Sequence, residues 1–275
     1  MIIGRLLLVR YPPLQRIVSL VRDDVKAVIN LWRKRIIFAV HMITNAEIKR
    51  IRSLREKKFR DEYGLFVVEG EKMVQEALVS DYEVEKVWRR DEIGEEAMAK
   101  ISQFSTPSPV LAVVRKPSVT DGFTAGGGLC LALDSVRDPG NMGTILRMAD
   151  WFGVRTVFIS PDSVELYNPK TVQATMGAVF RVHTVRTGIP DLCRRYRQAG
   201  LPVYGTFLDG EEIYGSELSC DALVVMGNES NGISPETAAE VTSRLLIPKA
   251  SGSRAESLNV AIATAITLSE FARRK

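Results

Sequence analysis

From residue 129 onward, short apolar runs alternate with stretches of helical periodicity, and this alternation constrains the fold more than any other feature. The strand-like runs are residues 129–133, 156–159, 179–185, 203–207, 222–226 and 245–247. The helical stretches are residues 142–152, 170–176, 190–199, 235–241 and 258–271. Strands that alternate with helices form mainly parallel sheets covered on both faces. The pattern predicts an α/β fold over residues 129–275, with binding sites beyond the carboxyl ends of the strands.

Residues 42–115 predict a second, smaller α/β domain. Thr44 and Glu47 have the spacing of a capping box, and Ile48, Ile51 and Leu54 follow at helical spacing. Strands are expected at 65–68, 84–88 and 110–114, with a helix at 72–79. The stretch 116–128 contains four glycines and one proline, which is typical of an exposed linker between domains.

A dense basic cluster lies in the first helix of this smaller domain. Its members are Lys49, Arg50, Arg52, Arg55, Lys57, Lys58 and Arg60. Such a cluster attracts phosphates, although a solvated helix face explains it equally well. The net charge of +4 is a poor guide here, because residues 1–41 alone hold eight Lys and Arg against two Asp.

Residues 1–41 form an N-terminal extension of uncertain role. The segment is basic, partly apolar and broken by Pro12 and Pro13. Three interpretations stay open: an upstream extension of a chain that starts at Met42, an organellar targeting segment, and a basic RNA-binding tail. Asp23 and Asp24 weaken the targeting interpretation.

The residue inventory excludes several kinds of site. Cys130, Cys193 and Cys220 show no CxxC spacing, so we expect reduced, mostly buried thiols. His41 and His183 alone give too little material for a histidine zinc site or a Ser-His-Asp triad. No apolar stretch approaches the ~20 residues of a membrane span, so we expect a soluble protein.

Three polar loops follow strands in the C-terminal half. In the first, Pro139 and Gly140 turn the chain, Asn141 is suited to cap the next helix, and Arg147 lies in that helix's second turn. The second loop contains Gly227 and Gly232, which permit close backbone approach. It matches neither GxGxxG nor a P-loop.

Polar residues in the second and third loops indicate binding. Glu229 lies in the second loop, where a tight turn alone would not require a carboxylate. The third loop runs from Ile247 to a helix for which Ser257 is a natural cap. Asn259 begins this apolar helix, and because an unpaired buried amide is costly, we expect it to have a polar partner.

Taken together, the loops resemble the three ordered motifs of the SpoU (TrmH-like) methyltransferases. The matching segments are Asn141-x-Gly143-x-x-x-Arg147, then residues 227–232 (GNESNG), then Ile247-Pro248 with Ser257-Leu258-Asn259-Val260. This similarity covers residues 128–273. Residues 45–115, with Lys58-Phe59-Arg60 and Phe66-Val67-Val68-Glu69-Gly70, resemble the family's N-terminal substrate-binding domain.

The resemblance implies an RNA ribose 2′-O-methyltransferase that uses S-adenosylmethionine, needs no metal and acts in the cytoplasm on ribosomal or transfer RNA. It implies a C-terminal trefoil knot, a rare exception to the avoidance of knots, and a homodimer with its active site at the interface. The implied cofactor-binding residues are Gly227, Asn228, Gly232, Ile247 and Leu258. The implied catalytic residues are Arg147, Asn141, Glu229, Ser257 and Asn259. The implied RNA-binding residues are Lys49, Arg52, Arg55, Lys58 and Arg60.

The same resemblance implies that Arg147 activates the ribose hydroxyl, but a guanidinium is a poor base. We interpret Arg147 as holding an RNA phosphate and the hydroxyl together, while the base is either that phosphate or a transiently neutral Arg147. Positioning and electrostatics would then supply most of the rate.

Two other functions compete with this one. A non-catalytic RNA-binding or assembly protein could keep the same fold, but it would be expected to lose motif residues. A base methyltransferase is disfavoured by the Arg147 motif. The segment between Pro248 and Ser257 is slightly longer than the family pattern, which leaves the rim of the site and the choice of RNA open.

Overall fold

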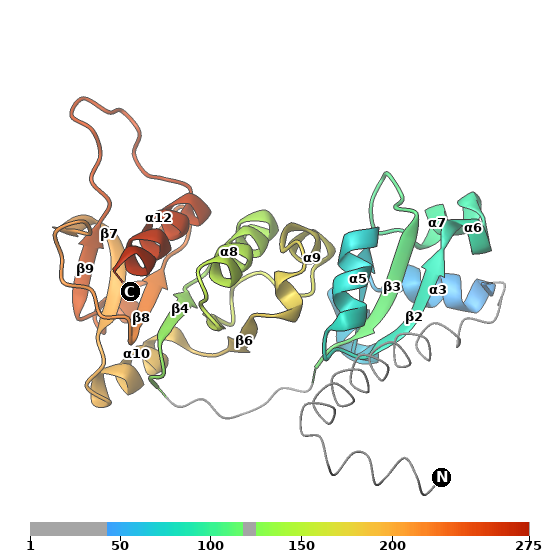
Figure 1. Ribbon diagram of the computed structural model, residues 1–275, viewed down its shortest axis with the longest axis horizontal. Helices are drawn as coiled ribbons and strands as arrows, with labels where there is room; N and C mark the ends of the chain where they lie inside the picture. The colour runs from blue at the N-terminus through green and yellow to red at the C-terminus, as the bar shows by residue number, and fades with distance from the viewer. Residues whose placement is uncertain (1–42, 118–124, 275) are drawn as a thin grey trace, which may run out of the picture. The chain divides into compact units, whose positions relative to one another are not determined.

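The computed structural model describes residues 43–117 and 125–274. The predictions for residues 1–41 and for the middle of the linker at 116–128 lie outside the described residues. Residues from Thr44 onward group into one unit, within which we distinguish an N-terminal module, residues 44–117, and a C-terminal module, residues 125–274 (Figure 1).

The C-terminal module is built on a parallel sheet, as predicted. Its strands lie in the order β6-β5-β4-β8-β7-β9, and each neighbouring pair is parallel. The strands are β4 (Leu129–Leu133), β5 (Thr156–Ile159), β6 (His183–Arg186), β7 (Val203–Glu212), β8 (Ala222–Met226) and β9 (Ser243–Leu246).

Helices cover both faces of this sheet because side chains along each strand alternate between them. Leu131 and Leu133 face one core, which α8 (Pro139–Trp151) and α12 (Val260–Arg273) share. Cys130 and Ala132 face the other core, against α10 (Ile189–Gln198). Figure 1 shows α8 and α12 on one side of the strands and α10 on the other.

The remaining helices of the C-terminal module are short. They are α9 (Pro169–Ala174), the 3₁₀ helix η1 (Ala178–Phe180) and α11 (Pro235–Ala238). The predicted strand at 179–185 is wrong in its first half, where the chain forms η1. Met176 and Gly177 both have positive φ, so the chain turns there, and Val179 is buried without pairing in the sheet.

The N-terminal module contains a three-stranded antiparallel sheet in the order β1-β3-β2. These strands are β1 (Leu65–Glu69), β2 (Val84–Arg89) and β3 (Val110–Arg115). Its helices are α3 (Asn45–Ser53), α4 (Lys57–Tyr63), α5 (Glu71–Val79), α6 (Arg90–Ile93) and α7 (Glu95–Ile101). Helices α6 and α7 are additions to the elements predicted from the sequence.

The predicted basic helix is divided into α3 and α4. The capping box of α3 forms as expected. The backbone N–H of Thr44 donates to the Glu47 carboxylate, and the backbone N–H of Glu47 donates to the Thr44 hydroxyl oxygen. The helix ends at Ser53 with the buried Leu54 as its C-cap, and Arg60 donates to the carbonyls of Leu54 and Arg55, just after the helix. The last carbonyls of the helix itself, those of Ile51, Arg52 and Ser53, accept from the backbone N–H groups of residues 54–56, so the helix ends without leaving them unpaired.

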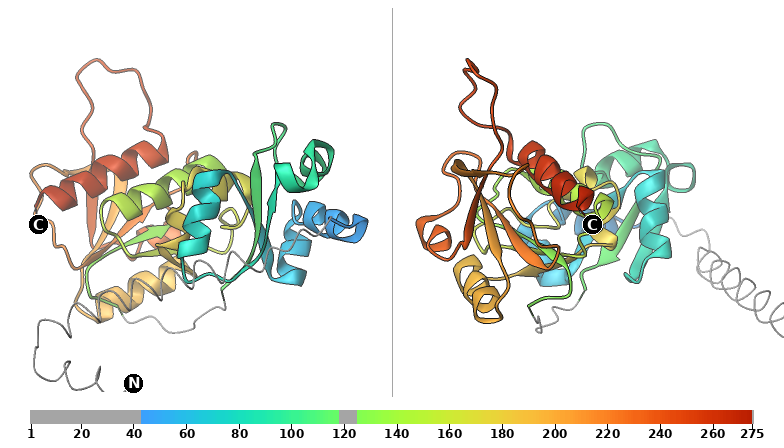
Figure 2. Two further views of the ribbon diagram at one scale, coloured as in Figure 1. Left: turned by 45° about the vertical axis from the view of Figure 1, so that its right-hand side comes forward. Right: turned by 60° about the vertical axis from the view of Figure 1, so that its left-hand side comes forward.

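Two further features concern the third loop and the helices as a group. The segment between β9 and α12 forms a long loop that projects away from the strands in both views of Figure 2, and residues 249–259 along it are exposed. Within the residues described, no helix has the length and apolar character needed to cross a membrane.

Candidate active site

The three loops lie at the carboxyl ends of strands of the parallel sheet. The first follows β4, the second follows β8 and the third follows β9. Strands β4 and β8 pair directly, with Leu133 opposite Met226, so the first two loops start side by side. The third loop returns to α12, which packs against α8.

Asn141 links all three loops through its side chain. Its Nδ2 donates to Oε1 of Glu229 at 3.0 Å, and its Oδ1 accepts from Nδ2 of Asn259 at 2.9 Å. These residues belong to the first, second and third motif respectively. The expected polar partner of Asn259 is therefore Asn141, although Asn259 is exposed and not buried as anticipated.

Asn141 is not the cap of α8, contrary to expectation. Asp138 is the N-cap, its carboxylate accepts from the backbone N–H of Asn141 at 2.7 Å, and Pro139 occupies the first helical position. Aspartate followed by proline is a favourable helix start. The side chain of Asn141 is consequently free to bind Glu229 and Asn259.

The cap of α12 also differs from expectation, because Asn259 takes the place predicted for Ser257. Oδ1 of Asn259 accepts from the backbone N–H of Ala261 and of Ile262. Ser257 is exposed in the projecting loop and forms no hydrogen bond with another described residue. The described structure does not bring Ser257 into the site.

The second loop is a closed turn organised by Asn228. The backbone groups of Asn228 and Gly232 bond reciprocally, at 2.8 and 3.0 Å. Oδ1 of Asn228 accepts from the N–H of Ser230 and of Asn231. At Gly227 an added Cβ would lie 2.2 Å from the Gly232 backbone, so no side chain fits there.

The first loop contains further residues that were not predicted from the sequence. Ser135 has a φ of +61°, and its carbonyl accepts from Nδ2 of Asn228 at 2.7 Å. Its hydroxyl donates to Asp162 and thereby lowers the pKa of that carboxyl. Asp134 is buried and accepts two bonds from Ser234. These links are between distant residues, and no local signal in the sequence marks them.

The residues expected to contact the cofactor leave backbone groups available. Gly227, Ile247 and Leu258 form no backbone hydrogen bond with another described residue. Gly227 is buried, and an unpaired buried peptide group is costly unless a ligand or water satisfies it. These groups fit S-adenosylmethionine, which has amine, carboxylate and adenine groups to pair with them.

Arg147 lies on the same helix as Asn141, six positions later and roughly 9 Å along the axis. Its side chain is exposed and makes no hydrogen bond or ion pair with a described residue. A guanidinium in this state can bind an incoming phosphate without first breaking another interaction.

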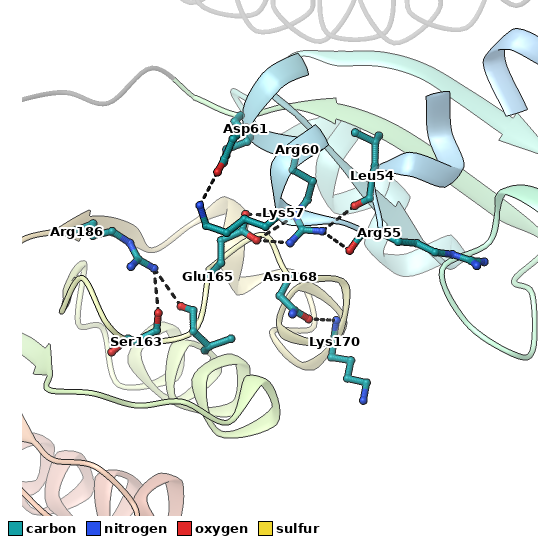
Figure 3. Close-up of polar contacts among 12 residues, drawn as sticks. Leu54, Arg55, Lys57, Arg60, Asp61, Ser163, Glu165, Asn168, Lys170 and Arg186 are labelled. Atoms are coloured by element: carbon teal, nitrogen blue, oxygen red, sulfur yellow. Dashed lines mark hydrogen bonds and ion pairs between the residues drawn. The ribbon is translucent and has the colours of Figure 1, made fainter. Parts of the chain in front are cut away.

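The expected RNA-binding residues divide into two groups. Lys49, Arg52, Arg55 and Lys58 are exposed. The expectation for Arg60 is wrong, because its side chain is only 3% exposed and all its guanidinium nitrogens are engaged, by Glu165 and by two carbonyls (Figure 3). The described residues contain no group of three or more His, Cys, Asp or Glu placed to hold a metal ion.

Two family models match the chain. The model of the SpoU rRNA Methylase family matches residues 128–269, more than half of the chain. The model of the MRM3-like substrate binding domain matches residues 45–93. The family resemblance drawn from the three motifs is confirmed.

Individual proteins match over most of their length. The chain is 30% identical to the 23S rRNA (guanosine(2553)-2′-O)-methyltransferase RlmP of Bacillus subtilis, over 81% of this chain and 94% of that protein. A putative RNA methyltransferase of the TrmH family from Porphyromonas gingivalis matches with a TM-score of 0.78 and 43% identity, covering 86% of this chain and all of that one.

A ligand-bound structure matches as well. The S-adenosylmethionine-bound rRNA methyltransferase from Sinorhizobium meliloti has a TM-score of 0.76 and 33% identity, covering 84% of this chain and 96% of that one. The chain therefore belongs to the SpoU rRNA methylase family, the S-adenosylmethionine-dependent RNA ribose 2′-O-methyltransferases whose three motifs it carries.

Proposed function

We propose that this protein transfers a methyl group from S-adenosylmethionine to a ribose 2′-hydroxyl of ribosomal RNA. The observation that carries the proposal is the contact of Asn141 with both Glu229 and Asn259. It joins the three motifs of a methyltransferase at the carboxyl ends of the strands. The relative from Bacillus subtilis is named for 23S ribosomal RNA, which favours ribosomal over transfer RNA. A cytoplasmic location belongs to the same proposal.

The bound cofactor would supply an electrophilic methyl group. The backbone groups of Gly227, Ile247 and Leu258 would hold it, and their lack of hydrogen-bond partners among the described residues supports this role. Asn228 and Gly232 contribute by shaping the turn that places Gly227. Asn141, Glu229 and Asn259 keep the loops in register around that position.

Arg147 acts on the RNA. Its guanidinium binds a phosphate next to the target ribose and stabilises the negative charge that develops on the 2′-oxygen as its proton leaves. The hydroxyl proton goes to the phosphate, or to an Arg147 that has first released a proton to solvent and regains its positive charge by accepting this one. The exposure of Arg147 and its lack of a partner among the described residues support a role toward substrate, because its nitrogens are available to bind RNA.

A homodimer with a knotted C-terminal segment is part of the proposal. Leu258 and Ile262 are 47% and 53% exposed beside Asn259, which is unusual for apolar residues next to a polar site and fits coverage by a second copy of the chain. Arg147→Ala chains can be mixed with Asn259→Ala chains to form heterodimers. If the two residues serve one site from opposite protomers, each heterodimer keeps one intact site and activity is restored. Analytical ultracentrifugation tests the dimer independently.

The direct test of the function is nucleoside mass spectrometry. The protein is incubated with S-adenosylmethionine and in vitro transcribed, hence unmodified, 23S ribosomal RNA, and the digest is searched for 2′-O-methylnucleosides and methylated bases. A new 2′-O-methylnucleoside supports the proposal. A methylated base would assign the other chemistry, and RNA binding without any methyl transfer would support an assembly protein.

A further inference from the structure

An ion pair connects the N-terminal module to the C-terminal module. Arg60 of α4 donates from Nε to Glu165 at 3.0 Å, and its Nη2 forms a second, shorter contact with the same carboxylate. The side chains are only 3% and 13% exposed. Figure 3 shows the pair between α4 and the loop that leads into α9.

A second connection ends on the helix that carries the active site. Arg181 contacts Glu76 of α5 through Nη1, and its Nε and Nη2 donate to Asp150 at 3.0 and 2.9 Å. Asp150 lies in α8, three positions after Arg147. One arginine therefore connects the N-terminal module to the helix of Asn141 and Arg147.

The chain beside this connection adopts a constrained conformation. Met176 has a φ of +51°, which is uncommon for a residue with a side chain, and Gly177 has a φ of +97°. A Cβ at Gly177 would lie 2.9 Å from Cγ of Glu76. The turn is thus shaped to admit α5, and strained conformations of this kind persist where the surroundings fix them.

Aromatic side chains of the two modules also pack against one another. The ring centroids of Phe66 and Tyr167 are 4.6 Å apart, and those of Tyr82 and Phe180 are 5.2 Å apart. The Tyr82 hydroxyl donates to the carbonyl of Val179. The burial of these apolar rings already stabilises the contact between the two modules. A buried ion pair such as Arg60–Glu165 adds little net stability, but it requires a particular geometry of the two side chains.

We propose that Arg60–Glu165 and Glu76–Arg181–Asp150 form a clamp that sets the position of the basic segment relative to Arg147, and so determines which ribose of a bound RNA is methylated. Here the basic segment means Lys49, Arg52, Arg55 and Lys58. The clamp residues are positioning residues, since their charged groups pair with one another. The proposal rests on the proposed function, because it concerns how that RNA is presented.

Glu76→Lys opens the clamp by placing two cations together. It has a matched control in Glu83→Lys, because Glu83 pairs with Arg115 inside the N-terminal module. Both variants change the net charge equally, so a general effect of charge on RNA affinity is common to both. Glu165→Gln is the second test variant and alters the buried pair.

The measurements use the full chain, in vitro transcribed 23S ribosomal RNA and S-adenosylmethionine. Single-turnover methyl transfer at saturating RNA gives the rate, mass spectrometry of nuclease fragments gives the methylated nucleotides, and calorimetry and thermal melting report cofactor affinity and folding. We expect the unaltered chain and Glu83→Lys to methylate the same nucleotide. We expect Glu76→Lys to be about tenfold slower there and to methylate neighbouring nucleotides as well, with unchanged cofactor affinity.

The outcomes separate the two proposals. If Glu165→Gln is folded, it should behave as Glu76→Lys does, and if it does not fold, Glu76→Lys decides. A folded Glu76→Lys that methylates only the original nucleotide at the original rate overturns the clamp, as does an equal redistribution in Glu83→Lys. Absence of methyl transfer by the unaltered chain would overturn the proposed function itself, and the clamp's role with it.

Discussion

The side-chain oxygen of Asn141 accepts a hydrogen bond from the side-chain amide of Asn259 at 2.9 Å, although 118 residues separate them in the chain. The same Asn259 caps α12 with its oxygen. One side chain therefore starts a helix and connects the third loop to the first.

These two roles of Asn259 can be separated by substitution. Asn259→Asp retains an oxygen for the cap but replaces the donor with an acceptor, which repels the Asn141 oxygen. We expect methyl transfer to slow about tenfold, the effect of losing about 1.4 kcal/mol in the transition state, with little change in melting temperature. Asn259→Ala should also lose about 1 kcal/mol of stability with the cap. Equal activity of Asn259→Asp and the unaltered chain would show that the contact with Asn141 has no part in the reaction.

Gly227 and Gly232 form a matched pair for testing the second loop. A Cβ at Gly227 would meet the Gly232 backbone at 2.2 Å, whereas at Gly232 there is open space and only an unfavourable φ of +67°. Gly227→Ala should cost about 1–3 kcal/mol of unfolding free energy and weaken cofactor binding. Gly232→Ala should cost about 1 kcal/mol and keep most of the affinity. Urea denaturation and calorimetry measure both, and the reverse order would contradict this account of the turn.

The basic segment should bind RNA through phosphates. Replacing Arg52, Arg55 and Lys58 by alanine should weaken RNA binding and make the slope of log K against log salt shallower, by roughly 0.7–0.9 for each phosphate that the variant no longer neutralises. Cofactor affinity should not change. Filter binding over a range of salt concentrations measures the slope.

The control for this experiment removes three exposed cations that lie elsewhere: Lys72, Lys100 and Arg195. Both triple variants lose the same charge. If both weaken RNA binding to the same degree, the effect is one of net charge and the basic segment is only a solvated surface.

Glu47 should make the stability of the N-terminal module depend on pH. The backbone N–H of Thr44, with smaller effects from Lys86, lowers the pKa of Glu47 to about 2. Because the folded value lies below the unfolded one of about 4.5, the stabilisation is complete above that pH and disappears as the pH falls toward 2. Glu47→Gln should therefore be less stable than the unaltered chain at pH 7 and equal to it near pH 2. Thermal melts from pH 7 to 2 test this, with the exposed Glu62→Gln as control; a difference independent of pH would refute the linkage.

Much of the C-terminal sheet could be predicted from sequence, because its central strands β4, β5 and β8 are almost wholly buried and consist of apolar runs. The strands at 129–133, 156–159 and 222–226 have the predicted bounds. The motif order also indicated the family. Capping was predicted less well: Asn141 and Ser257 were plausible caps, but Asp138 and Asn259 occupy those positions. Asp138-Pro139 was the local signal that would have corrected the first.

The contacts that complete the site could not be predicted, since they join distant residues. Nothing near Asn141 in sequence specifies Glu229 and Asn259 as its partners. Arg60 shows the same limit, because its neighbours are exposed cations while its own partner, Glu165, lies 105 residues away in the other module. A cluster of like charges in sequence does not reveal which member is buried.

We expect Arg147 to act on RNA in the chemical step and not to hold the cofactor. Arg147→Lys keeps the charge and loses the planar fork that can grip two oxygens, so turnover should fall, and Arg147→Ala should lower it further. The most direct measurement is single-turnover methyl transfer to unmodified 23S ribosomal RNA beside calorimetric titration of S-adenosylmethionine. We expect Arg147→Ala to transfer methyl at least about a hundredfold more slowly while binding the cofactor normally. Near-normal transfer by a folded Arg147→Ala would remove Arg147 from the mechanism, and loss of cofactor binding would move it to the cofactor site.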